Sequence, residues 1–132
     1  MTAETLSLIA YRLQRAREAL DEAALLLEQN HINTFVNRVY YACFYGVTAL
    51  LLTRDLASAK HSGVRSLFHQ HFVKAGVMSI NLGQTFDKLF DNRQKGDYAD
   101  MVRFEKEKVR GWLEEAKAFV DAIEKAIEEQ QA

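Results

Sequence analysis

Residues 33–54 of the chain read NTFVNRVYYACFYGVTALLLTR, and this stretch decides the fold. When its residues are placed at the helical step of about 100°, apolar side chains cover most of the helix surface. A core stripe runs through Val36, Val39, Cys43, Val47 and Leu50. Small side chains that allow a close neighbour form a second stripe, Ala42, Gly46 and Ala49. A helix that is apolar on most sides belongs in the middle of a helical bundle.

A third stripe of the same helix is polar and holds Arg38, Tyr41, Tyr45 and Thr48. Guanidinium, phenol and hydroxyl groups need hydrogen-bond partners if they are covered. In one interpretation the tyrosines fill gaps between helices while Arg38 reaches solvent. In the other, this stripe carries the function.

The segment before this helix is also predicted to be helical. Residues 3–28 begin after a candidate N-cap, Thr2, and carry an inward set at the helical period. That set is Leu6, Ile9, Ala10, Leu13, Ala16, Leu20, Ala24 and Leu27. The opposite face, which includes Arg12, Arg15 and Glu22, is predicted to be a solvated surface.

Two helices are predicted after the central one. A shorter helix covers residues 62–74, with Ser62 as its N-cap and Gly76 at its end. A fourth helix covers residues 81–94, and Gly96 supplies the left-handed residue that stops it.

The last predicted helix covers residues 101–129, with Asp97 or Asp100 as its N-cap. Its regular apolar stripe predicts that it packs lengthwise against the first two helices. Strand patterns and linkers are absent from the sequence. The sequence therefore predicts an all-α fold, a single domain over residues 1–132. We expect an antiparallel bundle of about five helices, four long and one short.

Arg93 stands in phase with the apolar stripe of the fourth predicted helix, Leu82, Phe86, Leu89 and Phe90. Continuing that stripe by one turn reaches the arginine. Such a side chain either stretches to the rim of the core or is held in a paired, partly covered site. The sequence leaves both arrangements open.

Composition points away from secreted and membrane proteins. Cys43 is the only cysteine, so an internal disulfide is excluded. The first residues, MTAETLSLIAYR, lack the basic start and apolar block of a signal peptide, and no apolar run is long enough to span a membrane. We expect a cytoplasmic protein.

No metal, cofactor or catalytic residue is predicted. A di-metal bundle needs two Glu-x-x-His pairs and two further glutamates, and the one such spacing, Glu28 to His31, falls at a helix end. His69 and His71 would point about 200° apart on a helix. Hydrolase elbows and glycine-rich phosphate loops are also missing.

Charge is distributed unevenly along the chain. The net charge is −1, but residues 54–96 hold seven basic and three acidic side chains, a local charge of +4. His61, His69 and His71 lie in the same segment. This middle third is therefore the expected location for a phosphate-bearing partner.

Four short motifs lie along this chain: RVYYA at residues 38–42, KHSG at 60–63, FHQHFVKAG at 68–76 and RQKGDY at 93–98. Together, over roughly residues 8–125, the chain resembles the HEPN domain family and in particular its small prokaryotic subgroup. That subgroup shows an Arg-x-Tyr-Tyr-Ala helix, a His-x-Gly turn, a Phe-x-Lys-x-Gly helix end and an Arg-x-x-x-Asp-Tyr close in this order.

The resemblance implies a homodimeric bundle that is often encoded beside a minimal nucleotidyltransferase in toxin–antitoxin-like pairs. Many relatives are metal-independent ribonucleases in which an arginine is followed, after four to six residues, by a histidine. Arg93 matches that arginine, but no histidine follows His71, and Tyr98 stands at the shortest spacing. A phenol, with an ordinary pKa near 10, is a poorer general base at neutral pH than an imidazole.

The polar stripe and the resemblance converge on one site if the second and fourth predicted helices are neighbours. Its guanidiniums would hold phosphate, and its aromatic rings a base or ribose. The predicted binding residues are Arg38, Tyr41, Tyr45, His61, Arg93, Asp97 and Tyr98.

Three functional hypotheses remain open. The first is a binding module that recognises a nucleotide, an RNA end or the partner nucleotidyltransferase. The second is a divergent metal-independent ribonuclease, in which Arg93 stabilises the transition-state phosphate while Tyr98, Asp97 or His61 acts as acid or base. The third is a purely structural dimeric bundle fixed by a covered Arg–Asp–Tyr network.

Overall fold

The computed structural model describes residues 1–98 and 102–131, without the side chains of residues 97 and 98. In order, its elements are α1 (Ala3–Glu28), α2 (Ile32–Leu52), α3 (His61–Phe68), a π-helical turn (His69–Val73), α4 (Ile80–Tyr98), α5 (Lys106–Val109) and α6 (Trp112–Gln131). These residues contain no strand, so the predicted all-α class is confirmed.

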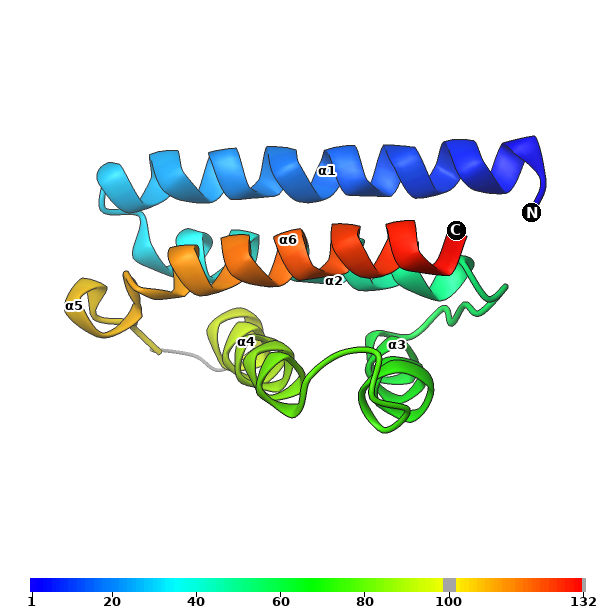
Figure 1. Cartoon of the computed structure of the whole chain (residues 1–132). Coiled ribbons are helices and arrows are strands. Elements are labelled where there is room, and N and C mark those ends of the chain that lie inside the picture. Colours follow the sequence, from blue (N-terminus) through cyan, green and yellow to red (C-terminus); the bar gives the residue numbers. More distant parts are fainter. Residues whose placement is uncertain (99–101, 132) are drawn as a thin grey trace.

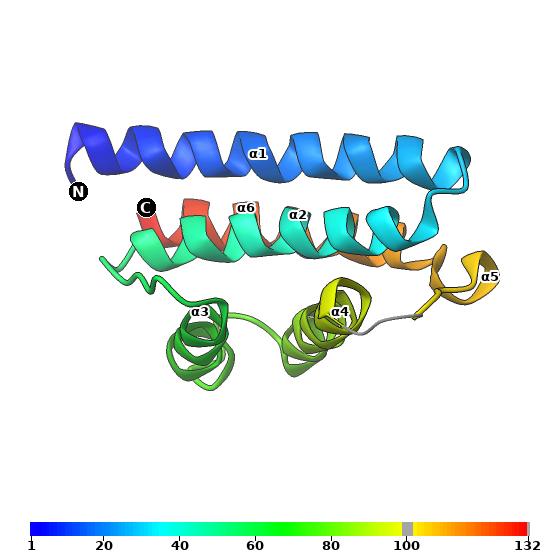
Figure 2. The ribbon, with the colours of Figure 1, turned by 180° about the vertical axis from the view of Figure 1, so that it is seen from behind.

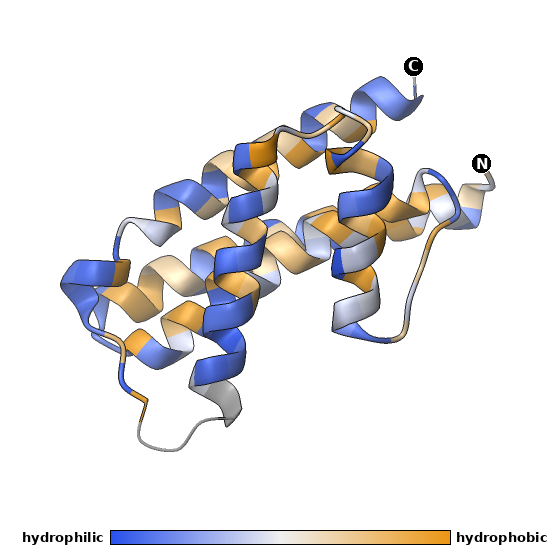
Figure 3. Cartoon of the chain, turned by 90° about the horizontal axis from the view of Figure 1, so that it is seen from below, coloured by the Kyte–Doolittle hydropathy of each residue, from blue (hydrophilic) through white to orange (hydrophobic). Residues whose placement is uncertain are grey.

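The bundle is built in layers (Figure 1). Helix α1 lies over α2 and α6, and α3 and α4 lie on the other side of that pair and run across it (Figure 3). Views from front and back show α1 antiparallel to both α2 and α6, which run in the same direction (Figure 2). The last helix thus lies alongside the first two, as predicted.

Helix α2 occupies the centre of the molecule. Its core stripe and its small-residue stripe are both fully buried, and Gly46 faces Ile123 of α6. By length and composition α2 would also suit a membrane span, but 61% of that window is buried inside the bundle. Its apolar surface is therefore used for packing within the protein.

Aromatic rings join the crossing helices to this centre. Phe86 of α4 stacks on Tyr40 of α2 at 6.0 Å and on Phe119 of α6 at 5.9 Å between ring centroids. Phe68 of α3 meets Phe86 edge-on at 5.5 Å. These contacts fix α4, which carries Arg93, against α2, which carries the polar stripe.

Two predicted helix ends are wrong. Ser62 lies inside α3, whose N-cap is Lys60 without a side-chain bond. Helix α4 continues through Gly96 to Tyr98. Gly96 is needed for another reason: a Cβ there would lie 2.9 Å from Phe104, so the missing side chain gives room to that ring. Gly76, with φ of +82°, does end the preceding helical segment.

The predicted last helix is interrupted near its start. Asn33 accepts a hydrogen bond from the backbone N–H of Phe104 and donates one to the carbonyl of Val102, which holds residues 102–104 outside a helix. A second break falls at Gly111, a poor helix former between α5 and α6. The proposed caps, Asp97 and Asp100, lie outside the described side chains.

Helix α1 begins and ends as predicted, and Thr2 accepts the capping bond from the N–H of Thr5. Two members of its predicted inward set are wrong, because Leu6 is 45% exposed and Ala10 is exposed as well. Both line a hollow between the start of α1 and the end of α6. The contact between these helices is therefore incomplete near the terminus of α1.

Gly63 in the first turn of α3 is required by a close approach. A Cβ added there would lie 2.1 Å from Oγ and 2.8 Å from Cβ of Ser58. We expect Gly63→Ala to lower the free energy of unfolding by about 1–3 kcal/mol, since the loop would have to move. Chemical denaturation measures this, with Gly111→Ala, which meets nothing within 4 Å, as the control. Equal stability of the two variants would contradict the prediction.

Candidate functional site

Arg93 is held against the tyrosines of α2. It is 8% exposed, and its Nη2 donates a hydrogen bond of 3.0 Å to the hydroxyl of Tyr41. Its Cζ lies 5.4 Å from the ring centroid of Tyr41 and 5.3 Å from that of Tyr40. Of the two arrangements that the sequence left open, the structure shows the paired, covered one. A guanidinium can be covered in this way because hydrogen bonds and aromatic faces stabilise its charge.

Arg38 approaches the same tyrosine. Its Cζ lies 5.1 Å from the ring centroid of Tyr41, so both guanidiniums pack on this ring. The nearest carboxylate oxygen, Oε1 of Glu22 on α1, is 3.8 Å from the Nε of Arg38, too far for a hydrogen bond. Arg38 makes no hydrogen bond within the described part of the chain. The Nε of Arg38 is buried, so its two terminal NH2 groups are the donors that can reach a ligand.

Tyr45 extends this surface toward α1. Its ring lies 6.0 Å from that of Tyr41, and the guanidinium of Arg15 lies 5.3 Å from it. We call the surface formed by Arg15, Arg38, Tyr41, Tyr45 and Arg93 the arginine–tyrosine face. It combines positive charge with aromatic rings, the two features that bind phosphates and bases.

His61, at the start of α3, borders this face. Its Nδ1 is 2.7 Å from the hydroxyl of the fully buried Tyr40. The imidazole stacks on Phe44 at 4.2 Å and meets the ring of Tyr41 edge-on at 5.8 Å. The orientation of His61 is therefore fixed by its neighbours on α2.

The bond to Tyr40 also decides which nitrogen of His61 carries the proton. Burial raises the pKa of the Tyr40 phenol, so its hydroxyl keeps its hydrogen. A buried hydroxyl needs an acceptor, and Nδ1 of His61 is the one within reach among the described side chains. Nδ1 then accepts, and neutral His61 carries its proton on Nε2. His61 is thus a hydrogen-bond donor rather than a ready base.

This tautomer can be tested by NMR. Burial and then the charge of Arg93 lower the pKa of His61, so we expect the neutral Nε2–H form at pH 7. The unfolded chain, with a pKa near 6.5, takes up the proton more readily, so His61 should lower stability as the pH falls through that value. Nitrogen-15 shifts of labelled histidine report the tautomer, and Tyr40→Phe should release it. A dominant Nδ1–H form in the wild type would contradict this assignment.

Comparison with known proteins agrees with this fold. The family model for the HEPN domain matches residues 9–127. The chain belongs to the HEPN domain family. A UPF0332 protein of Thermotoga maritima is 48% identical to this HEPN chain over 122 residues, covering 92% of each protein. The candidate toxin MJ0605 of Methanocaldococcus jannaschii is 37% identical over 117 residues, 89% of this chain and 87% of that protein.

The HEPN motifs meet at the site. Tyr41 of the first motif is the common contact. Arg38 of the same motif, His61 of the second and Arg93 of the fourth all touch it, and Tyr45 lies beside it. The predicted positions of Asp97 and Tyr98 lie outside the described side chains. The third motif stands apart, because its His69 pairs with Asp87 of α4 at 2.9 Å.

Sequence reasoning missed residues that complete this HEPN site. Arg15 and Glu22 were assigned to a solvated face of the first helix, yet they meet Tyr45 and Arg38. Their spacing of seven residues, two helical turns, would place them on one stripe and could have signalled a shared contact. Tyr40 was missed because periodicity shows that it is buried but not that its hydroxyl reaches His61.

Proposed function

We propose that this HEPN protein is a binding module that recognises a nucleotide, free or at an RNA end, on the arginine–tyrosine face. The observation that carries this proposal is the arrangement around Tyr41, where Arg93 bonds to the hydroxyl while Arg38 packs on the ring without a hydrogen bond to any described residue. Guanidinium groups bind phosphate through forked N–H donors. Nε2–H of His61 adds a neutral donor nearby.

A calorimetric titration with AMP, GMP, ATP and a short RNA tests this function. We expect Arg38→Ala to weaken nucleotide binding roughly tenfold, since a hydrogen bond to a charged group contributes about 1.5–3 kcal/mol. Arg110→Ala is the matched control, because Arg110 is an exposed arginine directly after α5 that pairs only with Glu107 among described residues. If the folded protein binds none of these ligands, the proposal is contradicted.

A divergent metal-independent ribonuclease is the second candidate. The observation in its favour is that His61 lies close enough to Arg93 for the charge of Arg93 to lower the pKa of the imidazole. Against it, the hydroxyl of Tyr40 occupies the Nδ1 lone pair, so His61 presents a proton. Cleavage of RNA in EDTA by wild type but not by Arg93→Ala would favour this enzyme, and equal cleavage by both would remove it.

We also propose that the protein forms a homodimer, acts in the cytoplasm and is partnered by a minimal nucleotidyltransferase in a toxin–antitoxin-like pair. Relatives described as candidate toxins support the last point. Leu8, Tyr11 and Leu25 support dimerisation: they are large, exposed and on the stripe of α1 that carries Arg15 and Glu22. Sedimentation of the pure protein, then with the product of the neighbouring gene, distinguishes these associations. A monomer in both runs would contradict them.

A further inference from the structure

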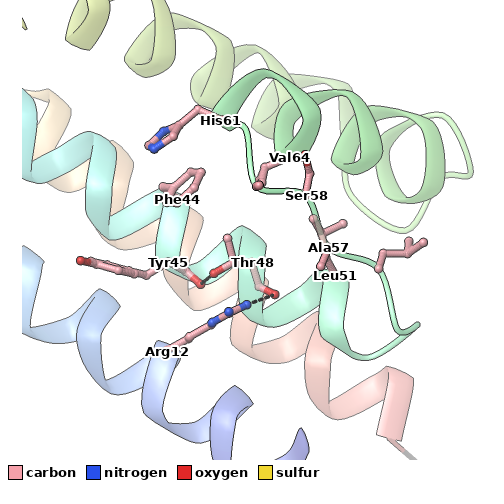
Figure 4. A pocket seen from close by; sticks show the side chains of 11 residues that line it. Arg12, Phe44, Tyr45, Thr48, Leu51, Ala57, Ser58, His61 and Val64 are labelled. Atoms are coloured by element: carbon pink, nitrogen blue, oxygen red, sulfur yellow. Dashed lines mark hydrogen bonds between the residues drawn. The ribbon is translucent and has the colours of Figure 1, made fainter.

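A pocket of about 320 Å³ adjoins the arginine–tyrosine face (Figure 4). It lies between α1, α2 and the segment that leads into α3. Its walls are largely apolar and include Phe44, Leu51, Leu56 and Val64. The volume is at the lower end of the range for ligand pockets, which run from about 300 to 1,000 Å³. It suits one flat ring system rather than a large cofactor.

Arg12 stands at the edge of this pocket without a counter-charge from any described residue. Its Nη1 donates one long hydrogen bond, 3.4 Å, to the carbonyl of Thr48. Figure 4 shows Arg12 on the opposite side of the pocket from His61. It has no ion pair with a carboxylate of the described residues, and burial lowers its pKa. By contrast, Arg15 and Arg17 on the same helix both pair with carboxylates.

Arg12 is only partly buried, so those of its N–H donors that make no bond within the described residues face solvent and can exchange water for a ligand. The hydroxyl of Thr48 is engaged elsewhere, because it donates to the carbonyl of Tyr45 at 2.8 Å. Within the described part of the chain, the carbonyl of Thr48 is therefore the one acceptor that bonds to Arg12 at this pocket, and the bond is long. A ligand that presents acceptor atoms would supply what the protein does not.

The pocket and the arginine–tyrosine face are continuous. Tyr45 belongs to the face and lines the pocket, and His61 lines the pocket while its ring contacts Tyr41. A nucleotide with its phosphate at Arg38 and Arg93 can extend past these shared residues into the pocket. The base is then the part that Arg12 meets.

Resting on the proposed nucleotide function, we infer that this pocket is a base subsite that selects guanine through Arg12. Guanine presents two adjacent acceptors, O6 and N7, which match the forked donors of an arginine. Adenine presents N7 beside its N6 amino group, and that amino group would face a second donor. The selection thus follows from the donors that Arg12 offers at the pocket edge.

Titration of the full chain with GMP and AMP tests this inference, since the two ligands share their phosphate and ribose. We expect GMP to bind at least about tenfold more tightly, the discrimination of one bidentate pair. Arg12→Met should remove most of that preference, and Arg12→Gln should shift it toward AMP, because glutamine pairs with N6 and N7 of adenine. Arg17→Met, on the same helix but facing α6, should keep it.

Thermal melting of each variant establishes that it is folded. Equal binding of GMP and AMP by the wild type would overturn the guanine subsite alone. A preference that survives Arg12→Met would also overturn it. Binding of neither nucleotide would instead overturn the proposed nucleotide function, and this inference with it.

Discussion

Replacing Arg93 with methionine should weaken nucleotide binding by roughly 10- to 100-fold, for GMP and AMP alike. The loss removes at least one charge-assisted hydrogen bond to phosphate, which contributes about 1.5–3 kcal/mol. Methionine keeps the length and apolar contacts of the side chain against Tyr40 and Tyr41. Calorimetric titration measures the change. Arg93→Lys should give an intermediate affinity, since it retains the charge but loses the planar fork.

The same variants separate a ligand site from a packing network. If Arg93 serves only to fix α4 on α2, Arg93→Met lowers the melting temperature and leaves the ligand affinity of the folded protein unchanged. If Arg93 binds phosphate, the free energy of binding falls by more than the free energy of unfolding does. A variant that melts normally and binds nucleotide as tightly as the wild type would contradict the assigned role of Arg93.

Truncating Phe86 to alanine should lower the free energy of unfolding by about 3–5 kcal/mol. The ring is fully buried and packs between Tyr40, Phe68, Phe90 and Phe119, so its removal leaves a cavity at the crossing of four helices. That loss is a large share of the 5–15 kcal/mol that stabilises a typical domain. Denaturant titration measures the change.

Ile80→Ala is the control for this truncation, because Ile80 is 69% exposed and its loss should change stability by less than about 0.5 kcal/mol. Phe86→Ala should also weaken nucleotide binding, since Phe86 positions α4 and hence Arg93. A loss of stability as small as that of the control would contradict the central place given to this aromatic cluster.

The sequence predicted the architecture well because apolar periodicity reflects burial directly. The central helix, the bounds of α1 and the buried stripes of α2 follow from it. The end of α4 was missed because glycine has two uses: Gly76 ends a helix with positive φ, whereas Gly96 gives room to Phe104. The break before α5 was missed because it depends on Asn33, about 70 residues away along the chain.

Prediction of the candidate site depended on two kinds of information. Periodicity placed Arg38, Tyr41 and Tyr45 on one stripe, and Arg93 in phase with a core face. Their convergence requires that α2 and α4 be neighbours. From a single sequence, this adjacency could be inferred only through the family resemblance. The proton on His61 and the position of Arg12, which has no carboxylate partner among the described residues, depend on atomic distances, so no spacing rule could have revealed either.

The most direct measurement of the central claim follows the arginine side chains themselves. Nitrogen-15 spectra of the Nε–H groups, recorded during titration with GMP, report each guanidinium separately. We predict that the signals of Arg38 and Arg93 move together along one binding curve while those of Arg17 and Arg110 stay in place. Signals of Arg38 and Arg93 that remain unmoved at saturating GMP, or move no more than those two controls, would contradict the account.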